Sequence, residues 1–185
     1  TQSHQKEDFF FNYGKMPKVT NDGFNIKIGG SVNLSENSKA YANYGLYDRQ
    51  PFHSALFSNE RYSNDLNPDV KNEEITGFEL GYAYEKSNFR AIIDLYSTKW
   101  GNRILVSSSF DDGQLQSFSR TSNVEQVHIG AEAQIVYQPS NEFILRAYAS
   151  VGDWKYNNNV TSTSYDETGQ QIAQGGTLYL EDVKV

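Results

Sequence analysis

Residues 24–34 read FNIKIGGSVNL, and this stretch decides the fold because apolar and polar residues alternate strictly along it. A β-strand turns successive side chains to opposite faces, so the alternation predicts one apolar and one polar face. The apolar face would carry Phe24, Ile26, Ile28, Gly30, Val32 and Leu34. We therefore expect a strand that borders an apolar medium on one side and a polar medium on the other.

The alternation returns in later segments, which we predict as strands at 39–48, 73–85, 89–107, 124–138 and 142–156, with another beginning at 177–185. Short turns alternate with long polar loops, and the predicted long loops are 48–72, 108–123 and 156–176. Tight periplasmic turns and long extracellular loops are typical of outer-membrane barrels. The sequence therefore predicts an all-β fold, an antiparallel transmembrane β-barrel.

Three details refine this prediction. The segment 89–107 exceeds the roughly 9–11 residues that a membrane strand needs, so its second half should project beyond the bilayer. Aromatic residues flank the short turns, where an interfacial girdle is expected; they are Tyr84, Phe89, Tyr137 and Phe143. Before the first clear strand, residues 9–11 are expected to close an earlier strand and residues 12–23 to form a loop.

Composition excludes several classes of protein. The chain has 185 residues, 37% of them hydrophobic, and no stretch approaches the roughly 18 apolar residues of a membrane helix. A mean hydropathy of −0.66 agrees with barrel strands, which are only half apolar. The net charge is −7 without a cluster of lysine or arginine, which argues against a nucleic-acid partner. Cysteine is absent, which excludes thiolate chemistry.

The N-terminal residues 1–8 are polar and show no apolar core of a secretory signal. We expect either that a signal was removed or that the chain is an internal piece of a longer protein. The histidines at 4, 53 and 128 lack the spacing of metal ligands. Asp111 and Asp112 precede Gly113 without the regular oxygen spacing of a calcium loop. No metal site and no cofactor are therefore predicted.

Four carboxylates fall on the predicted inner face, but they are scattered over three predicted strands: Glu79, Glu85, Asp94 and Glu132. A glycosidase needs a pair of carboxylates at a fixed separation, and nothing else in the chain suggests hydrolysis. These carboxylates are expected to pair with Lys27, Arg90 and Arg146 on the same inner wall. His128 is also predicted to face inward as a wall residue. No catalytic residue is predicted, and the chain is not expected to be an enzyme.

Aromatic residues in the predicted loops are the candidate ligand contacts, because flat rings amid polar residues stack on sugars and other flat ligands. The candidates are Phe52, His53, Phe57, Tyr62, Phe110, Phe118 and Tyr165. The alternative is that these rings pack loop against loop. Trp100 and Trp154, near the strand tops, are expected to support the loops or an upper girdle.

Four short sequence motifs within about residues 24–156 resemble those of a known protein family. They are NYGLYDRQP at 43–51, NPDVKNE at 67–73, FELGY at 78–82, and LYSTKW at 95–100 followed by Arg103. In order and spacing, these motifs resemble four elements of TonB-dependent outer-membrane receptors. Those elements are an aromatic strand end with R-x-P, an N-P-x-L-K-x-E element, an E-x-G strand and a T-x-W element.

The resemblance implies a barrel of about 22 strands with a plugged lumen, in the outer membrane of a Gram-negative bacterium. Such receptors bind a scarce nutrient, a chelate or a glycan, at their extracellular loops and plug. The implied partners are outer-membrane lipid, the remaining barrel and plug, a TonB energy complex and a surface lipoprotein. Residues 1–185 show no recognisable plug, energising box or terminal aromatic strand. They are therefore expected to be a segment of about six to eight strands from the C-terminal part of the receptor's barrel domain.

Two rival functions stay open at this stage. A complete small outer-membrane barrel with a structural or adhesion role would need about eight strands and would fold alone in detergent. A secreted soluble β-protein that binds carbohydrate through its loop aromatics would also show alternating strands, and it would need no detergent.

Overall fold

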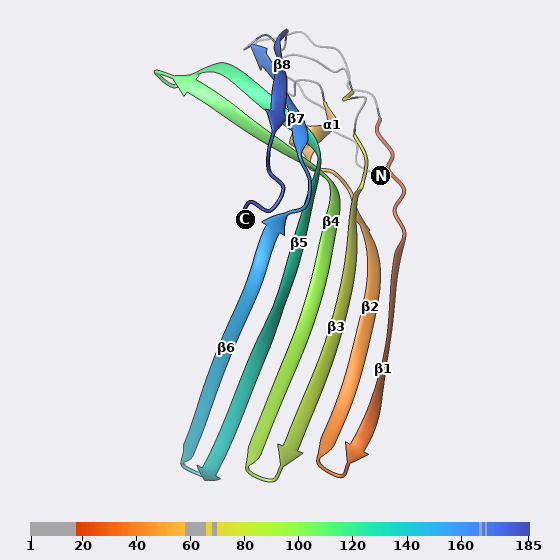
Figure 1. Ribbon diagram of the computed structural model, residues 1–185, viewed down its shortest axis with the longest axis vertical. Coiled ribbons are helices and arrows are strands. Elements are labelled where there is room, and N and C mark those ends of the chain that lie inside the picture. Colours follow the sequence, from red (N-terminus) through yellow and green to blue (C-terminus); the bar gives the residue numbers. More distant parts are fainter. Residues whose placement is uncertain (1–17, 58–65, 68–69, 167, 169) are drawn as a thin grey trace.

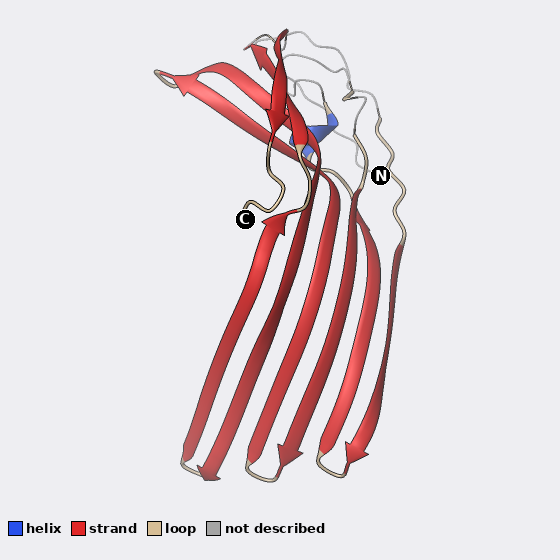
Figure 2. Cartoon of the chain, viewed as in Figure 1, coloured by secondary structure: helices blue, strands red, loops and turns tan. Residues whose placement is uncertain are grey.

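The computed structural model describes residues 18–57, 66–67, 70–166, 168 and 170–185. Within them the chain forms one antiparallel sheet of eight strands and one short helix, α1 (His53–Leu56) (Figure 2). The strands are β1 (Asn25–Ser35), β2 (Ser38–Arg49), β3 (Glu73–Lys86), β4 (Phe89–Asp111), β5 (Gln114–Ser140), β6 (Phe143–Tyr156), β7 (Val160–Asp166) and β8 (Gln171–Leu178). The predicted early strand at 9–11 lies outside the described residues. No described helix is long and apolar enough to cross a bilayer.

The strands divide into two regions because β5 is long enough to serve both (Figure 1). Its lower part pairs with β6 through Gln126–Ser140, and its upper part pairs with β7 through 117–121. We call β1–β3, β6 and the lower parts of β4 and β5 the wall. We call the upper parts of β4 and β5, with β7 and β8, the upper sheet. The wall is a simple meander, and the sheet stays open rather than closing on itself.

The wall has the predicted apolar outer face. Ile28, Leu95 and Val151 are 67%, 50% and 70% exposed although each is a large apolar residue. A continuous exposed apolar face of this extent is unusual in a soluble monomer and is expected of a barrel wall in contact with lipid. The apolar band on β4 runs from Phe89 up to Lys99, which matches the roughly 9–11 residues of a membrane strand.

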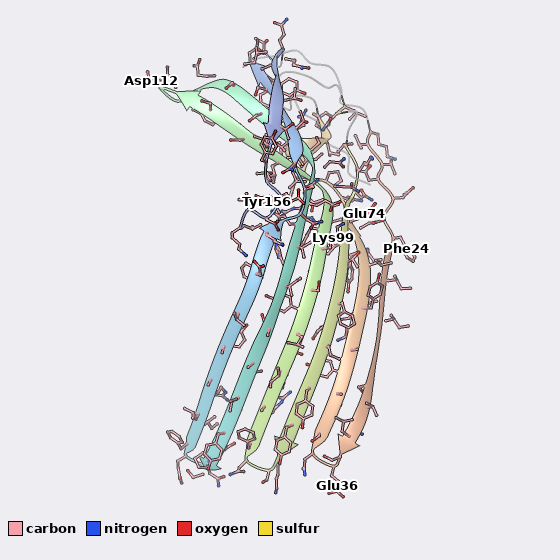
Figure 3. The ribbon with its side chains drawn as sticks, in the orientation of Figure 1. Phe24, Glu36, Glu74, Lys99, Asp112 and Tyr156 are labelled. Carbon is pink, nitrogen blue, oxygen red and sulfur yellow. The ribbon has the colours of Figure 1, made fainter. Side chains whose placement is uncertain are left out.

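Short turns close the lower end of the wall. On its outer face, the ring of Phe89 lies 6.1 Å from that of Tyr84 and 6.4 Å from that of Tyr137. These three residues form the predicted aromatic row above the turns. At the upper end of the apolar band, charged residues appear instead. Glu74 and Lys99 lie at this level, whereas Glu36 marks a lower turn (Figure 3).

Two predicted loops are wrong. Residues 108–123 were expected to form a loop, but β4 continues to Asp111 and β5 begins at Gln114, so they form a β-hairpin. Most of the predicted loop 156–176 likewise forms β7 and the start of β8. These strands are rich in serine and threonine and lack the apolar alternation that marks the wall, so the sequence pattern predicted loops instead. The predicted strand 177–185 is also wrong, because β8 ends at Leu178 and Lys184 makes only an isolated bridge to Lys155.

Candidate functional site

A cluster of charged and aromatic side chains joins the tops of β2, β3, β4 and β5 on the inner face. Glu73 is only 4% exposed and forms an ion pair with Arg49. Arg103 places its Nε atom 3.8 Å from the same carboxylate and donates a hydrogen bond to Gln126. Both guanidinium groups lie over the ring of Trp100, at 5.2 and 5.3 Å from its centroid. We call these five residues the mouth cluster. It holds four strands at the open end of the wall.

The connection between β2 and β3 folds inward above the mouth cluster. Leu56 and Phe57 at the end of α1 are almost fully buried, and Val19 and Val70 pack against them. Asn67, itself buried, donates its backbone N–H to Leu56 O at 3.0 Å and its Nδ2 to Ala55 O at 3.1 Å. The described part of this connection therefore has a small core of its own.

A buried arginine ties this connection to the upper sheet. Arg120 is 6% exposed, and its Nη2 donates to the backbone oxygen of Phe57 at 2.6 Å. Its guanidinium also lies 6.0 Å from the ring centroid of Phe118 and 5.6 Å from that of Tyr165. These two rings stack on each other at 4.9 Å with an angle of 11°. Arg120 therefore joins three connections that are far apart in the sequence.

The comparison with protein families agrees with this architecture. The family described as TonB dependent receptor-like, beta-barrel matches residues 2–182. The chain belongs to the TonB-dependent receptor β-barrel family. Members of this family are outer-membrane transporters of Gram-negative bacteria. The match confirms the predicted family and fold class. A search of curated proteins and a search of solved structures give no match to this chain.

Membership in this family assigns the two ends of the wall to the two sides of the outer membrane. The short turns mark its periplasmic end, and the mouth cluster with the upper sheet marks its extracellular end. Three of the four motifs behind the resemblance converge at the extracellular end, because Arg49, Glu73, Trp100 and Arg103 belong to the mouth cluster and Asn67 lies above it. The fourth, at 78–82, lies within the wall strand β3.

The predicted ligand-contacting aromatics do not gather into one receptor surface. Phe52 and Phe110 are 60% and 54% exposed, whereas Phe57 and Phe118 are buried, as the alternative of packing between loops predicts for these two. Tyr165 is half-buried against Phe118, and the His53 ring lies 5.3 Å from the Phe57 ring. Tyr62 lies outside the described residues. Ligand contact stays a prediction for the candidate set, and Phe52 and Phe110 are the described candidates whose side chains are more than half exposed.

The inner face of the wall is polar, as predicted, and it holds a shallow hollow of about 400 Å³. Six of its lining residues are Lys27, Asn43, Glu79, Asp94, Tyr96 and Glu132. Tyr41 donates its hydroxyl to Asp94, and Asn43 donates to Glu79 at 3.3 Å. The expected pairing with arginine or lysine is found for Glu85, which lies 3.9 Å from Arg90. For Glu79 and Asp94 it is wrong, because neutral side chains bind these carboxylates instead: Asn43 lies directly across from Glu79, and Tyr41 reaches Asp94 across Gly81 of β3.

Large rings on this inner face lie flat over glycines of adjacent strands. A side chain at Gly81 would collide with the ring of Tyr41, and one at Gly130 would collide with the hydroxyl end of Tyr96. Because glycine has no side chain, the tyrosine rings can lie directly against the backbone of the neighbouring strand. Near the top, Trp154 donates to the Tyr96 hydroxyl at 3.1 Å and lies 5.6 Å from the ring of His128, which faces inward as predicted.

A collar of ion pairs marks the upper limit of the apolar band on the outer face. Lys99 lies 2.9 Å from Glu125, and Lys184 pairs with Asp153. Hydrogen bonds from Lys99 and then from Asn157 hold the pKa of Glu125 below its usual value. The collar places paired opposite charges where the apolar band of the outer face ends.

Sequence reasoning missed Arg120 and the part played by the asparagines. Arg120 stands alone in a serine-rich stretch that the alternation test reads as loop. Asn102 and Asn123 have positive φ angles of 56° and 63°. Asparagine tolerates this conformation better than most residues, so an asparagine inside a long predicted strand was the available signal for a bend.

Proposed function

We propose that this chain forms part of the wall and mouth of a transporter that takes up a nutrient, a chelate or a glycan, with energy from a TonB complex. The observation that carries the proposal is the two-faced wall, which is apolar outside, polar inside and capped at one end by a packed mouth. A polar lumen through an apolar band suits the passage of a hydrophilic nutrient across lipid. The role proposed is binding and passage rather than chemistry on the ligand.

The open edges of the wall support the proposed partners. Among the described strands, β1 has a neighbour on one side only, and β6 pairs with β5 along its length and, near its top, with residues 182–185. Backbone groups left unpaired in lipid cost several kcal/mol each. Further strands of the same barrel would remove that cost. A plug would contact the polar inner face, and a surface lipoprotein would contact the upper sheet from outside.

The proposal predicts the mass and the energy dependence of the native protein. An antibody raised against residues 107–118 should detect a band several times heavier than 21.0 kDa in the outer-membrane fraction. Cells that lack the protein should lose uptake of one nutrient in a panel of chelates and oligosaccharides. Collapse of the proton gradient should abolish the same uptake in the parent strain. A band near 21 kDa, or uptake that continues without the gradient, would contradict the proposal.

A further inference from the structure

The β4–β5 ribbon leaves the wall at two successive β-bulges. In the first, residues 101–102 of β4 stand opposite Glu125; in the second, residues 122–123 of β5 stand opposite Ile104. Asn102 and Asn123, which have positive φ, occupy the two bulges. Above them the ribbon bends away from the wall while β7 and β8 rise beside it (Figure 1). Bulges of this kind re-aim side chains and are common next to binding sites.

An open cavity of about 610 Å³ lies at the second bulge. This size falls within the roughly 300–1,000 Å³ typical of ligand sites. Its lining comes from four separate segments and is polar apart from one valine; it consists of Lys71, Ser122, Asn123, Asn158, Asn159, Val160, Thr161 and Thr177. The bend of the ribbon therefore opens a polar chamber at the extracellular mouth.

Two of the asparagines build the chamber, and other side chains remain available. Asn158 donates to the backbone oxygen of Asn123 at 2.8 Å and accepts from the Glu125 N–H at 2.9 Å. Asn159 accepts from the Glu181 N–H at 3.1 Å. By contrast, five lining side chains make no hydrogen bond or ion pair with any described residue: Lys71, Ser122, Asn123, Thr161 and Thr177. They offer one ammonium, one amide and three hydroxyls to a ligand.

The charged groups near the chamber differ in what they already contact. Arg49 and Arg103 share the Glu73 carboxylate, and Arg120 donates to the backbone oxygen of Phe57, and none of the three lines the cavity. Two carboxylates lie beside the lining: Glu125 pairs with Lys99, and Glu181 accepts from Asn159 at 3.4 Å. Lys71 is the charged residue of the described lining, and it has no ion pair with a described residue. Its ammonium group is therefore available to an anionic group of a ligand.

We infer that this chamber binds an acidic sugar of an oligosaccharide, with Lys71 on the sugar carboxylate and the amide and hydroxyls on its hydroxyl groups. Amide and hydroxyl side chains both donate and accept, which suits the mixed hydrogen bonding of a sugar ring. One ammonium supplies the single positive charge that one carboxylate needs. This inference names a substrate class for the proposed transporter and rests on that proposed function.

The test uses the full receptor, purified in detergent, and calorimetric titration with tetragalacturonate. Maltotetraose serves as the neutral probe and ferric citrate as an anionic chelate. We expect tetragalacturonate to bind at least tenfold more tightly than maltotetraose. Lys71→Gln should weaken tetragalacturonate binding about tenfold, or about 1.4 kcal/mol, and Lys71→Arg should restore it. Thr177→Val, which keeps the shape of the side chain, should weaken binding about threefold.

Lys39→Gln is the matched control, because Lys39 is an exposed lysine near the periplasmic turn between β1 and β2; its binding should equal that of the parent. Equal affinity for both oligosaccharides, or an unchanged Lys71→Gln, would overturn the inference. So would Lys71-dependent binding of ferric citrate without binding of tetragalacturonate. Energised uptake of another nutrient with no tetragalacturonate binding would overturn the inference alone. Lys71-dependent binding without energised uptake would overturn only the proposed transport.

Discussion

The wall and the upper sheet are built from the same continuous strands, β4 and β5, yet different interactions stabilise them. In the wall, apolar side chains face outward along each strand, and lipid takes the place of a protein core. The upper sheet has water around it and is held by a few buried anchors, above all Arg120 and Phe118. The same strand is therefore stabilised by lipid contact along its whole outer face in the wall, and by a few buried side chains in the upper sheet.

This difference decides how each region should respond to substitution. A wall strand should tolerate many apolar exchanges on its outer face, because lipid adapts to shape. The mouth should be sensitive at few positions, because each buried charge has a specific partner. The transition occurs within three residues of β4, between Trp100 and Arg103, where the register with β5 shifts.

The largest effect is expected at the junction of the two regions. Glu73→Ala would leave Arg49 and Arg103 without their shared buried carboxylate, which should cost about 3–5 kcal/mol of unfolding free energy. The measurement is urea unfolding of the receptor in lipid vesicles. Glu74→Ala is the matched control, because Glu74 is exposed, and it should cost less than about 0.5 kcal/mol. Equal costs at both positions would show that the mouth cluster does not stabilise the mouth.

The next effect tests the lipid face of the wall. Ala131 stands between Leu95 and Val151 on the outer face, near the middle of the apolar band. Ala131→Arg should cost about 2–4 kcal/mol in a bilayer. Gln134→Arg, on the inner face of the same strand, should cost little. Refolding yields of the two variants in vesicles give the comparison. Equal tolerance of arginine on both faces would contradict the assignment of the outer face to lipid.

The same contrast explains which strands could be predicted from the sequence. The wall strands and their faces were predictable, because lipid on one side and water on the other impose a period of two on residues such as Ile28 and Lys27. The upper sheet was not, because serines pair across β4, β5 and β7 at Ser107, Ser119 and Ser164 without any apolar face. Backbone hydrogen bonds form those strands, and they leave no periodic trace in the sequence.

The candidate site was predictable only in part, for a related reason. Loop aromatics were identifiable as a class, but nothing in the sequence distinguishes Phe118, which is 7% exposed, from Phe110, which is 54% exposed. That difference depends on which ring meets Tyr165 and Arg120 in space. The chamber at the second bulge was not predictable either, because its lining residues are separated by up to 106 positions, from Lys71 to Thr177.

A smaller effect distinguishes a folded upper sheet from a loosely packed one. Phe118→Ala removes a buried ring that stacks on Tyr165 and should cost about 2 kcal/mol, below the roughly 3–5 kcal/mol of a ring enclosed in a full core. Phe110→Ala, near the exposed tip of the same ribbon, should cost less than about 0.5 kcal/mol. Protease cleavage within β7–β8 should accelerate in the first variant and stay unchanged in the second. Equal cleavage rates would mean that the stack does not hold the upper sheet together.

The smallest effect lies in the collar between the two regions and depends on pH. Hydrogen bonds from Lys99 and Asn157 lower the pKa of Glu125 in the folded protein. Its stabilising contribution should therefore be complete above the unfolded pKa, about 4.3, and disappear as the pH falls through the lower folded value. Because Glu125 is partly exposed, this contribution should be below about 1 kcal/mol.

Urea unfolding at pH 7 and at pH 3 measures this contribution directly. Acid should destabilise the parent more than Glu125→Gln, which has no carboxylate to protonate at that position. Glu36→Gln, at an exposed periplasmic turn, should follow the parent at both pH values. If Glu125→Gln loses as much stability in acid as the parent, the Lys99–Glu125 pair does not contribute to the collar. The Lys184–Asp153 pair would then be the remaining ion pair of the collar as defined here.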